Sequence, residues 1–201
     1  MRKFMLTMAI VLLLAPAALA QTSVDETKAA KSDGTVEISN VAGSVQIIGW
    51  DKPEIHIAGT LEKNVERLDF DVRDGRSVIK VILPKHGGNH TGADLTIQLP
   101  QSSILEVNTV SASVSVDNTA SPSLEQGVAE KMQIKTVSGE IQMKSAANNL
   151  SVESVSGDLQ LDTKSKEATL KTVSGDVHFS GTVESMRTES VSGDLTHVGT
   201  I

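Results

Sequence analysis

The feature that most constrains the fold of this 201-residue chain is a short motif that recurs at a fixed period. A valine followed by serine and glycine begins at Val137, Val155, Val173 and Val191, each 18 residues after the last. A period this short indicates one small supersecondary unit stacked on copies of itself, because a single unit cannot bury its apolar face alone. The chain is therefore expected to build an elongated stack of units.

A common frame extends the repeat to six units, which start at Val36, Leu105, Met132, Leu150, Ala168 and Met186. With the first residue as position 0, positions 0, 2, 5, 9 and 11 are apolar in 28 of 30 cases, and positions 1, 3 and 10 are polar in all 18 cases. Alternation with period two is typical of strands with one buried face. Each unit is therefore predicted to contain two short strands. The alternation breaks before position 5, so we expect a bend there with its valine buried in a repeated interior corner.

A polar turn separates the two predicted strands. Positions 6 to 8 read Ser-Gly-Asp in three units and Ser-Gly-Glu in a fourth, and glycine allows the positive φ angle that such a turn needs. Six mostly polar residues, such as 162–167, are expected to close each coil. The sequence thus predicts an all-β fold, a parallel β-solenoid with rungs of about 18 residues, spaced about 4.8 Å apart.

The stretch between Ile47 and Leu105 departs from this period. It contains alternating runs around an Asp74-Gly75 turn signal, which predicts an antiparallel hairpin. We expect a signal peptide over 1–20, a flexible segment over 21–34 and one solenoid domain over 35–201. That domain is predicted to be irregular over 35–104 and regular over 105–201, with a mobile loop at 117–131.

The first 20 residues have the organisation of a cleaved secretory signal. Arg2 and Lys3 precede an apolar core over 4–14, and Ala18-Leu19-Ala20 fits the small-x-small cleavage rule. The core is shorter than the ~20 residues that span a bilayer, so no stable membrane insertion is expected after cleavage. The mature protein is predicted to begin near Gln21 and to be periplasmic or secreted from a bacterium. With no cysteine in the chain, we expect neither disulfides nor lipid attachment to cysteine.

Charge and aromatic content argue against nucleic-acid partners. Without Arg2 and Lys3 the mature chain keeps 16 basic against 25 acidic residues, a net charge of −9, which disfavours nucleic acids and anionic membrane surfaces. Its aromatic residues are only Trp50, Phe70 and Phe179, too few for a base-stacking platform.

Two groups of residues are candidate metal ligands. The turns place acidic residues in one column, where oxygen atoms on successive coils could cage calcium; the alternative is a set of solvated turn residues. A second group, in the sequence His-Gly-Gly-Asn-His, offers two imidazoles. We predict no metal site and no cofactor, with these as the candidates: Glu140, Asp158, Asp176, Asp194, His86 and His90.

No catalytic residues are predicted. Serines beside aspartates recur as a structural turn, and nothing resembles a nucleophile elbow. The alternative is an enzyme that acts on envelope polysaccharide, in which the loop at 117–131 would have to supply the groove, with Glu125, Glu130 and Lys131 as its charged residues.

Three parts of the sequence carry a family resemblance: the unit at 36–51, the run Leu-Thr-Ile-Gln-Leu-Pro at 95–100, and the repeated Thr-Val-Ser-Gly-Asp/Glu motif. The chain resembles the bacterial β-strand-repeat family described as putative adhesins, a domain of unknown function. The resemblance covers nearly all of the mature chain. It implies an exported β-solenoid of the cell envelope without established catalytic residues.

Together these features predict a non-enzymatic, adhesin-like module for binding or structural interaction in the cell envelope. The expected partner is an envelope protein or polymer of unknown identity. Self-association through the C-terminal rung is also expected, because an open strand edge invites pairing. The alternative is a periplasmic accessory or regulatory protein of the envelope stress response.

Overall fold

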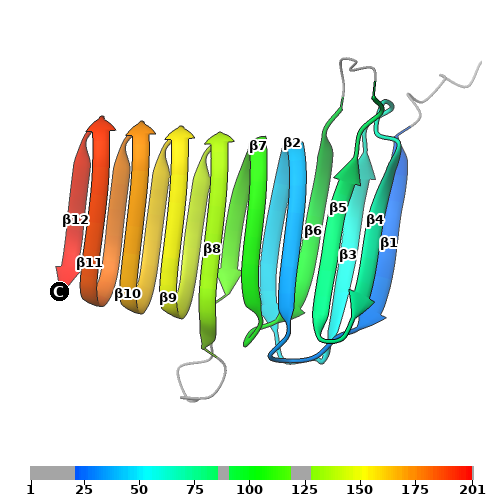
Figure 1. Ribbon diagram of the computed structural model, residues 1–201, viewed down its shortest axis with the longest axis horizontal. Coiled ribbons are helices and arrows are strands. Elements are labelled where there is room, and N and C mark those ends of the chain that lie inside the picture. Colours follow the sequence, from blue (N-terminus) through cyan, green and yellow to red (C-terminus); the bar gives the residue numbers. More distant parts are fainter. Residues whose placement is uncertain (1–20, 86–90, 119–127, 201) are drawn as a thin grey trace, which may run out of the picture.

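The computed structural model describes residues 21–85, 91–118 and 128–200, and all the regular secondary structure in these ranges is β (Figure 1). No helix in these ranges could span a membrane. The strands, in chain order, are β1 (Thr22–Ala29), β2 (Thr35–Trp50), β3 (Glu54–Leu61), β4 (Arg67–Arg73), β5 (Arg76–Ile82), β6 (Ala93–Pro100), β7 (Ile104–Asn118), β8 (Ala129–Ser138), β9 (Ile141–Ser156), β10 (Leu159–Ser174), β11 (Val177–Ser192) and β12 (Leu195–Thr200).

The repeat units stack side by side along the long axis of the molecule (Figure 1). The strands that carry them, β2 and β7 to β12, pair in parallel. The partners across the ladder are the first residues of the predicted units: Val36 with Leu105, Leu105 with Met132, Met132 with Leu150, Leu150 with Ala168, and Ala168 with Met186. The repeat frame of the sequence is therefore the hydrogen-bonding register of the stack.

The sheet as a whole is mixed. The N-terminal part adds antiparallel pairs between β1 and β3, β3 and β6, and β4 and β5. The predicted hairpin at Asp74-Gly75 is the β4–β5 pair, and both turn residues have positive φ angles, 50° and 78°. The all-β prediction is confirmed and the fold is β-solenoid-like, but parallel pairing does not extend over every strand.

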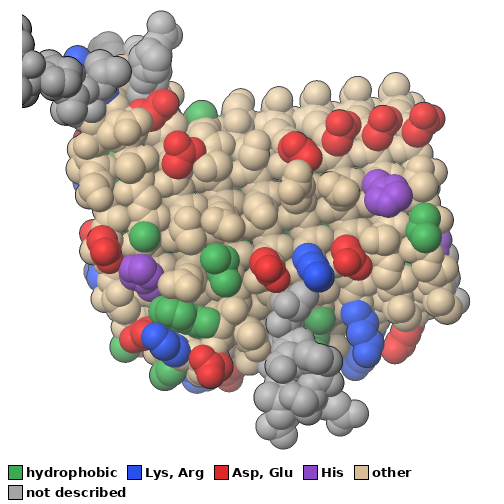
Figure 2. Space-filling model, turned by 180° about the vertical axis from the view of Figure 1, so that it is seen from behind, with side chains coloured by type: hydrophobic (Ala, Val, Ile, Leu, Met, Phe, Trp, Pro, Cys, Tyr) green, Lys and Arg blue, Asp and Glu red, His purple; other side chains and the backbone are tan. Residues whose placement is uncertain are grey.

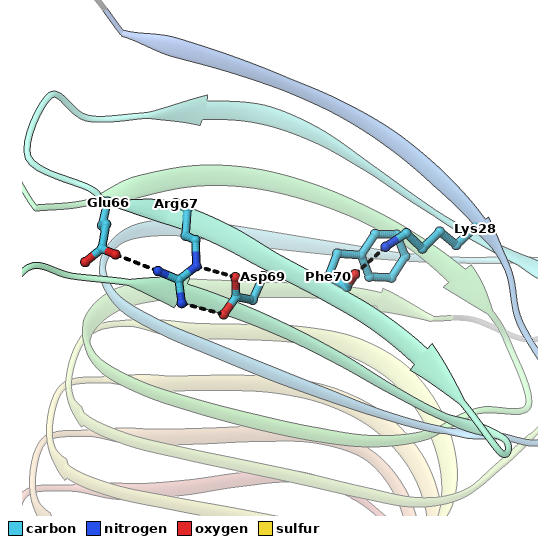
Figure 3. A network of polar contacts seen from close by, with 5 residues as sticks. All are labelled: Lys28, Glu66, Arg67, Asp69 and Phe70. Carbon is cyan, nitrogen blue, oxygen red and sulfur yellow. Dashed lines mark hydrogen bonds and ion pairs between the residues drawn. The ribbon is translucent and has the colours of Figure 1, made fainter.

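The expectation of a flexible segment over 21–34 is wrong, because β1 occupies most of it. Backbone pairing with β3 holds this strand, and its side chains are mostly exposed, so it has little of the apolar alternation that reveals a strand. The Lys28 ammonium donates a hydrogen bond to the Phe70 carbonyl oxygen and lies 4.5 Å from the centre of the Phe70 ring (Figure 3). At the start of β4, Arg67 bridges Glu66 and Asp69 (Figure 3).

The interior of each rung is apolar at the positions predicted, with one exception. Positions 0, 2, 9 and 11 of the first five units are all buried, and their side chains form the core. Position 5 is different: Val110, Val137, Val155 and Val173 are 45–48% exposed and Val191 is 82% exposed. The predicted valine-filled corner is therefore wrong for these units.

The reason is that the alternation of inward and outward side chains does not break before position 5. It continues through position 4, whose hydroxyl-bearing residues Thr109, Thr136, Ser154 and Thr172 are buried in place of the valines. Likewise, residues 162–167 are part of β10 and not a closing loop, since Thr163 and Ser165 point into the core. The polarity of these small side chains concealed strand positions from a count of apolar residues.

The chain reverses at the Ser-Gly-Asp/Glu turn. Gly157 has a φ angle of 134°, and a Cβ atom added to it would lie 2.3 Å from the Gly139 carbonyl oxygen of the preceding rung. Gly175 and Gly193 repeat this geometry against the glycine one rung earlier. Glycine is required here both for the backbone angle and for the close contact between rungs.

We expect Leu159→Ala to lower the free energy of unfolding by roughly 2 to 5 kcal/mol, because Leu159 is 1% exposed and its truncation leaves a cavity. Val155→Ala, four residues earlier, is the control and should cost less than about 1 kcal/mol, since its side chain is half in solvent. Chemical denaturation of both variants measures the difference. Equal losses would contradict the outward orientation of the valines.

Candidate functional site

A shallow groove of about 720 Å³ runs across the strands from β7 to β11. It follows the stack just before the Ser-Gly-Asp/Glu turns and is formed by positions 3, 4 and 5 of successive units, together with Thr188 at position 2 of the last unit. We call it the valine groove. Its lining is Asn108, Thr109, Lys135, Thr136, Val137, Glu153, Ser154, Val155, Lys171, Thr172, Val173, Thr188, Glu189, Ser190 and Val191.

One wall of the groove is a column of exposed valines. Residues in register on neighbouring rungs are about 4.8 Å apart, so the valines that line the groove, from Val137 to Val191, extend over about 14 Å. A single exposed valine on a protein surface is ordinary, but a contiguous apolar stripe marks a contact surface. The valine column is such a stripe.

The other wall is a column of alternating charge: Lys135, Glu153, Lys171 and Glu189. Lys135 Nζ lies 2.9 Å from Glu153 Oε2, and Lys171 Nζ lies 3.3 Å from Glu189 Oε2. Hydrogen bonds from Arg187, and then from Lys171, lower the pKa of the Glu189 carboxyl, which therefore stays ionised in mildly acidic solution. The four side chains are 38–46% exposed, so their ion pairs add little to stability and leave the charges available for other contacts.

The floor of the groove is backbone and the buried hydroxyls beneath it. Thr136 and Ser154 are each 5% exposed and point into the core. The Thr172 hydroxyl donates a 3.3 Å hydrogen bond to the Ser174 carbonyl oxygen. Since position 4 points inward, the outward residues at positions 3 and 5 stand as two ridges with a furrow between them.

The predicted acidic column exists, and two of its carboxylates, Asp158 and Asp176, accept hydrogen bonds from backbone N–H groups. The Asp176 N–H donates to Asp158 Oδ1 at 3.0 Å, and the Asp194 N–H donates to Asp176 Oδ1 at 2.9 Å. Glu140 accepts a 2.7 Å hydrogen bond from the Gln142 amide. Figure 2 shows acidic side chains in a row along one border of the rear face. Each bonded aspartate thus links one rung to the next.

Among the described residues, the structure brings together no other predicted site. Over residues 21–85, 91–118 and 128–200, no group of three or more His, Cys, Asp or Glu side chains could hold a metal ion. His86, His90 and Glu125 lie outside the described residues. Glu130, at the start of β8, accepts a 2.9 Å hydrogen bond from the Asn148 amide. Lys131 is exposed on the same strand.

A half-buried histidine was not anticipated. His56 on β3 contacts Gln98 Oε1 through Nδ1 and Asp25 Oδ1 through Nε2, both at 3.0 Å, and its ring stacks on Trp50. The hydrogen bond with Gln98, and then that with Asp25, raises the pKa of His56. These contacts tie β1, β3 and β6 together, and the residues come from segments that the sequence pattern did not place side by side.

The valine groove is a further feature that was not predicted, because its valines were expected in the interior. The signal that could have found it is the serine or threonine at position 4 of every unit from Thr109 onward. With positions 0 and 2 buried, strict period two places position 4 inside and position 5 outside.

At the C-terminal end, β12 pairs with β11 and with no other described strand. Leu195 and Val198 on this strand are 50% and 57% exposed. Self-association through this rung stays a prediction.

A comparison with protein families matches residues 81–200 to a family described as Toastrack DUF4097. No curated protein matches the chain. Solved structures of similar shape include a putative adhesin from Bacteroides fragilis NCTC 9343, with 11% identity, 90% of this chain and 99% of that chain covered, and a TM-score of 0.48. A putative cell adhesion protein from Clostridium sporogenes ATCC 15579 is 11% identical, with 90% of this chain and 100% of that chain covered and a TM-score of 0.41. A putative lipid binding protein from Parabacteroides distasonis ATCC 8503 has 14% identity, coverage of 87% and 96%, and a TM-score of 0.39.

We expect Asp158→Asn to leave the melting temperature nearly unchanged, because the asparagine carbonyl can still accept the Asp176 N–H. Asp158→Ala should lower it, because that N–H then loses its partner in the next rung. Scanning calorimetry with and without calcium measures both effects. A melting temperature that calcium raises in the native protein, but not in Asp158→Asn, would instead assign the column to calcium binding.

Proposed function

This chain belongs to the Toastrack DUF4097 family, and from that premise we propose that it is a non-enzymatic module that binds another macromolecule through the valine groove. The family match agrees with the resemblance inferred from the sequence. The domain has no assigned function, so the proposal rests on the surface of this chain.

The observation that carries the proposal is the column of solvent-facing valines beside a column of charges. The three lining valines at 47–48% exposure and Val191 at 82% keep methyl groups in contact with water along one line. Burying that line against a partner is favourable in proportion to the apolar area removed from solvent. The adjoining charges would select the partner and its orientation, because opposite charges must meet across the contact.

The chemistry of the groove supports binding in preference to catalysis. Its lining contains hydroxyls, lysines and glutamates but no histidine. The two glutamates, Glu153 and Glu189, are each paired with a lysine in exposed positions. General acid–base catalysis commonly depends on buried ionisable groups, and these two carboxylates are partly exposed to solvent.

The groove is also rigid, which favours a binding role. Each residue that lines it belongs to a strand that is hydrogen-bonded to neighbouring rungs. A surface that is ordered before binding loses little conformational entropy on contact. We place this module outside the cytoplasm of a bacterium, in the periplasm or secreted, on the strength of the amino-terminal signal pattern.

A photoreactive phenylalanine analogue in place of Val155 tests the groove in cells that produce the protein. We expect irradiation to give a covalent adduct of higher mass, because Val155 lies in the middle of the valine column. The matched control is Gln160, an exposed residue in the other half of the same repeat unit. Equal labelling from both positions, or none from Val155, would refute the groove as the binding surface.

Mass spectrometry of the protein recovered from periplasm and medium tests the proposed export. The mature chain is expected to begin at Gln21, and Ala18→Lys should leave the precursor uncut because the cleavage rule needs a small residue there. Recovery of the native chain from the cytoplasm with its first 20 residues intact would contradict the proposal.

A further inference from the structure

We propose that the partner of the valine groove is a second copy of this chain, packed side by side with its stack running in the opposite direction. The inference rests on the function proposed above and names its partner. The two copies would be related by a two-fold axis that passes between the rungs of Val155 and Val173.

The order of charges along the groove carries the inference. From β8 to β11 the column reads Lys135, Glu153, Lys171 and Glu189, that is plus, minus, plus, minus. Reversing this order gives minus, plus, minus, plus, which is its complement. In a two-fold antiparallel contact, Lys135 therefore faces Glu189 of the second copy, and Glu153 faces Lys171.

The same operation is self-consistent for all four positions, as an isologous interface requires. A two-fold contact in which the copies run in the same direction keeps the rungs level, and it would instead place lysine on lysine and glutamate on glutamate at every rung. Like charges that face each other disfavour a contact. Among two-fold arrangements, the charge column therefore selects the antiparallel direction.

The apolar column fits the same arrangement. Because position 5 lies two residues from position 3 on the same face, the valines follow the two-fold symmetry of the charges. Val155 meets Val173 of the second copy, and Val137 meets Val191. Each copy presents the valine ridge beside the charged ridge, so the two-fold axis brings each ridge against the same ridge of the other copy.

The size of the surface predicts a weak dimer. The four charged rungs span about 14 Å, since neighbouring rungs are about 4.8 Å apart, and the strip is only two ridges wide. The area that such a strip can bury is well below the about 800 Å² per partner of a standard protein–protein interface. We therefore expect a dissociation constant of about 0.1 to 1 mM, with weaker association at high salt because the charges are exposed.

Charge exchange between two variants tests the arrangement. Glu153→Lys places a lysine against Lys171 of the second copy, and Lys171→Glu places a glutamate against Glu153. Each variant alone should associate more weakly than the native mature protein, by about tenfold or more. An equimolar mixture of the two should recover native association, because the reversed charges then meet as opposite pairs. Sedimentation equilibrium up to about 1 mM covers the expected range.

Lys164→Glu is the matched control. It makes the same charge change as Lys171→Glu on an exposed residue of the same strand outside the groove, and it should leave association unchanged. Circular dichroism of every variant should match the native spectrum, since the altered side chains lie on the surface. A native protein that stays monomeric up to about 1 mM, or a mixture that fails to recover association, would overturn the proposal.

Cysteine cross-linking independently tests the direction in which the two stacks run relative to each other. Single-cysteine variants are suitable because the chain has no cysteine of its own. A mixture of Val155→Cys and Val173→Cys should form the mixed disulfide fastest. Val137→Cys alone should form little, because two copies of that position lie about three rungs, or 14 Å, apart along the axis. Efficient Val137→Cys homodimers would show parallel packing and refute the antiparallel arrangement. The adducts formed at Val155 in cells separate the two proposals. If every adduct contains a different protein and none contains a second copy of this chain, the second copy is refuted as the partner, and the function proposed for the groove stays intact.

Discussion

Parallel pairing in constant register is the constraint on which the rest of this structure depends. Each regular rung pairs residue for residue with the rung 18 positions away, so any residue type that recurs in the unit becomes a column along the stack. The apolar core, the inward hydroxyls, the exposed valines and both charged columns are consequences of this one relation. The relation in turn needs glycine at the turn, because a Cβ atom at Gly157 or Gly175 would strike the carbonyl oxygen one rung away.

A column also brings side chains of the same charge close together, where they repel each other. This chain reduces that repulsion in two ways. At the turn, three successive rungs carry aspartate, and Asp158 and Asp176 each accept a hydrogen bond from the backbone N–H of the next aspartate. A donor placed at each of these two carboxylates offsets part of the repulsion between them. At position 3 the chain instead alternates lysine and glutamate, which pair within the column. The first solution holds the stack together, whereas the second leaves a pattern that a partner can recognise.

Much of this arrangement is predictable from the repeat, and the failures have physical causes. The six-unit frame is the observed register, since Val36, Leu105 and Met132 lie side by side although 69 and 27 residues separate them in the chain. The predicted inward orientation of Val155 was wrong because the residue was assigned to the interior on the basis of its apolar side chain alone. In the structure the strand continues, so the smaller hydroxyl of Ser154 is inside. The strand β1 could not be predicted because its backbone pairing leaves few apolar side chains to detect, and the contacts of His56 depend on that same pairing.

The segments inserted into the 18-residue repeat all lie away from the groove. The long departures from the 18-residue period, at residues 51–104 and 119–128, both fall after position 12 of a unit, near the corner where one unit passes to the next. The turn beside the groove keeps three residues between position 5 and position 9 in all six units, from Val41–Val45 to Val191–Leu195. A change of length at this turn would break the valine column and shift the charges beside it out of register. Length variation at the other corner leaves both columns intact, so the stack can accept extra segments there while it preserves one continuous surface for contact.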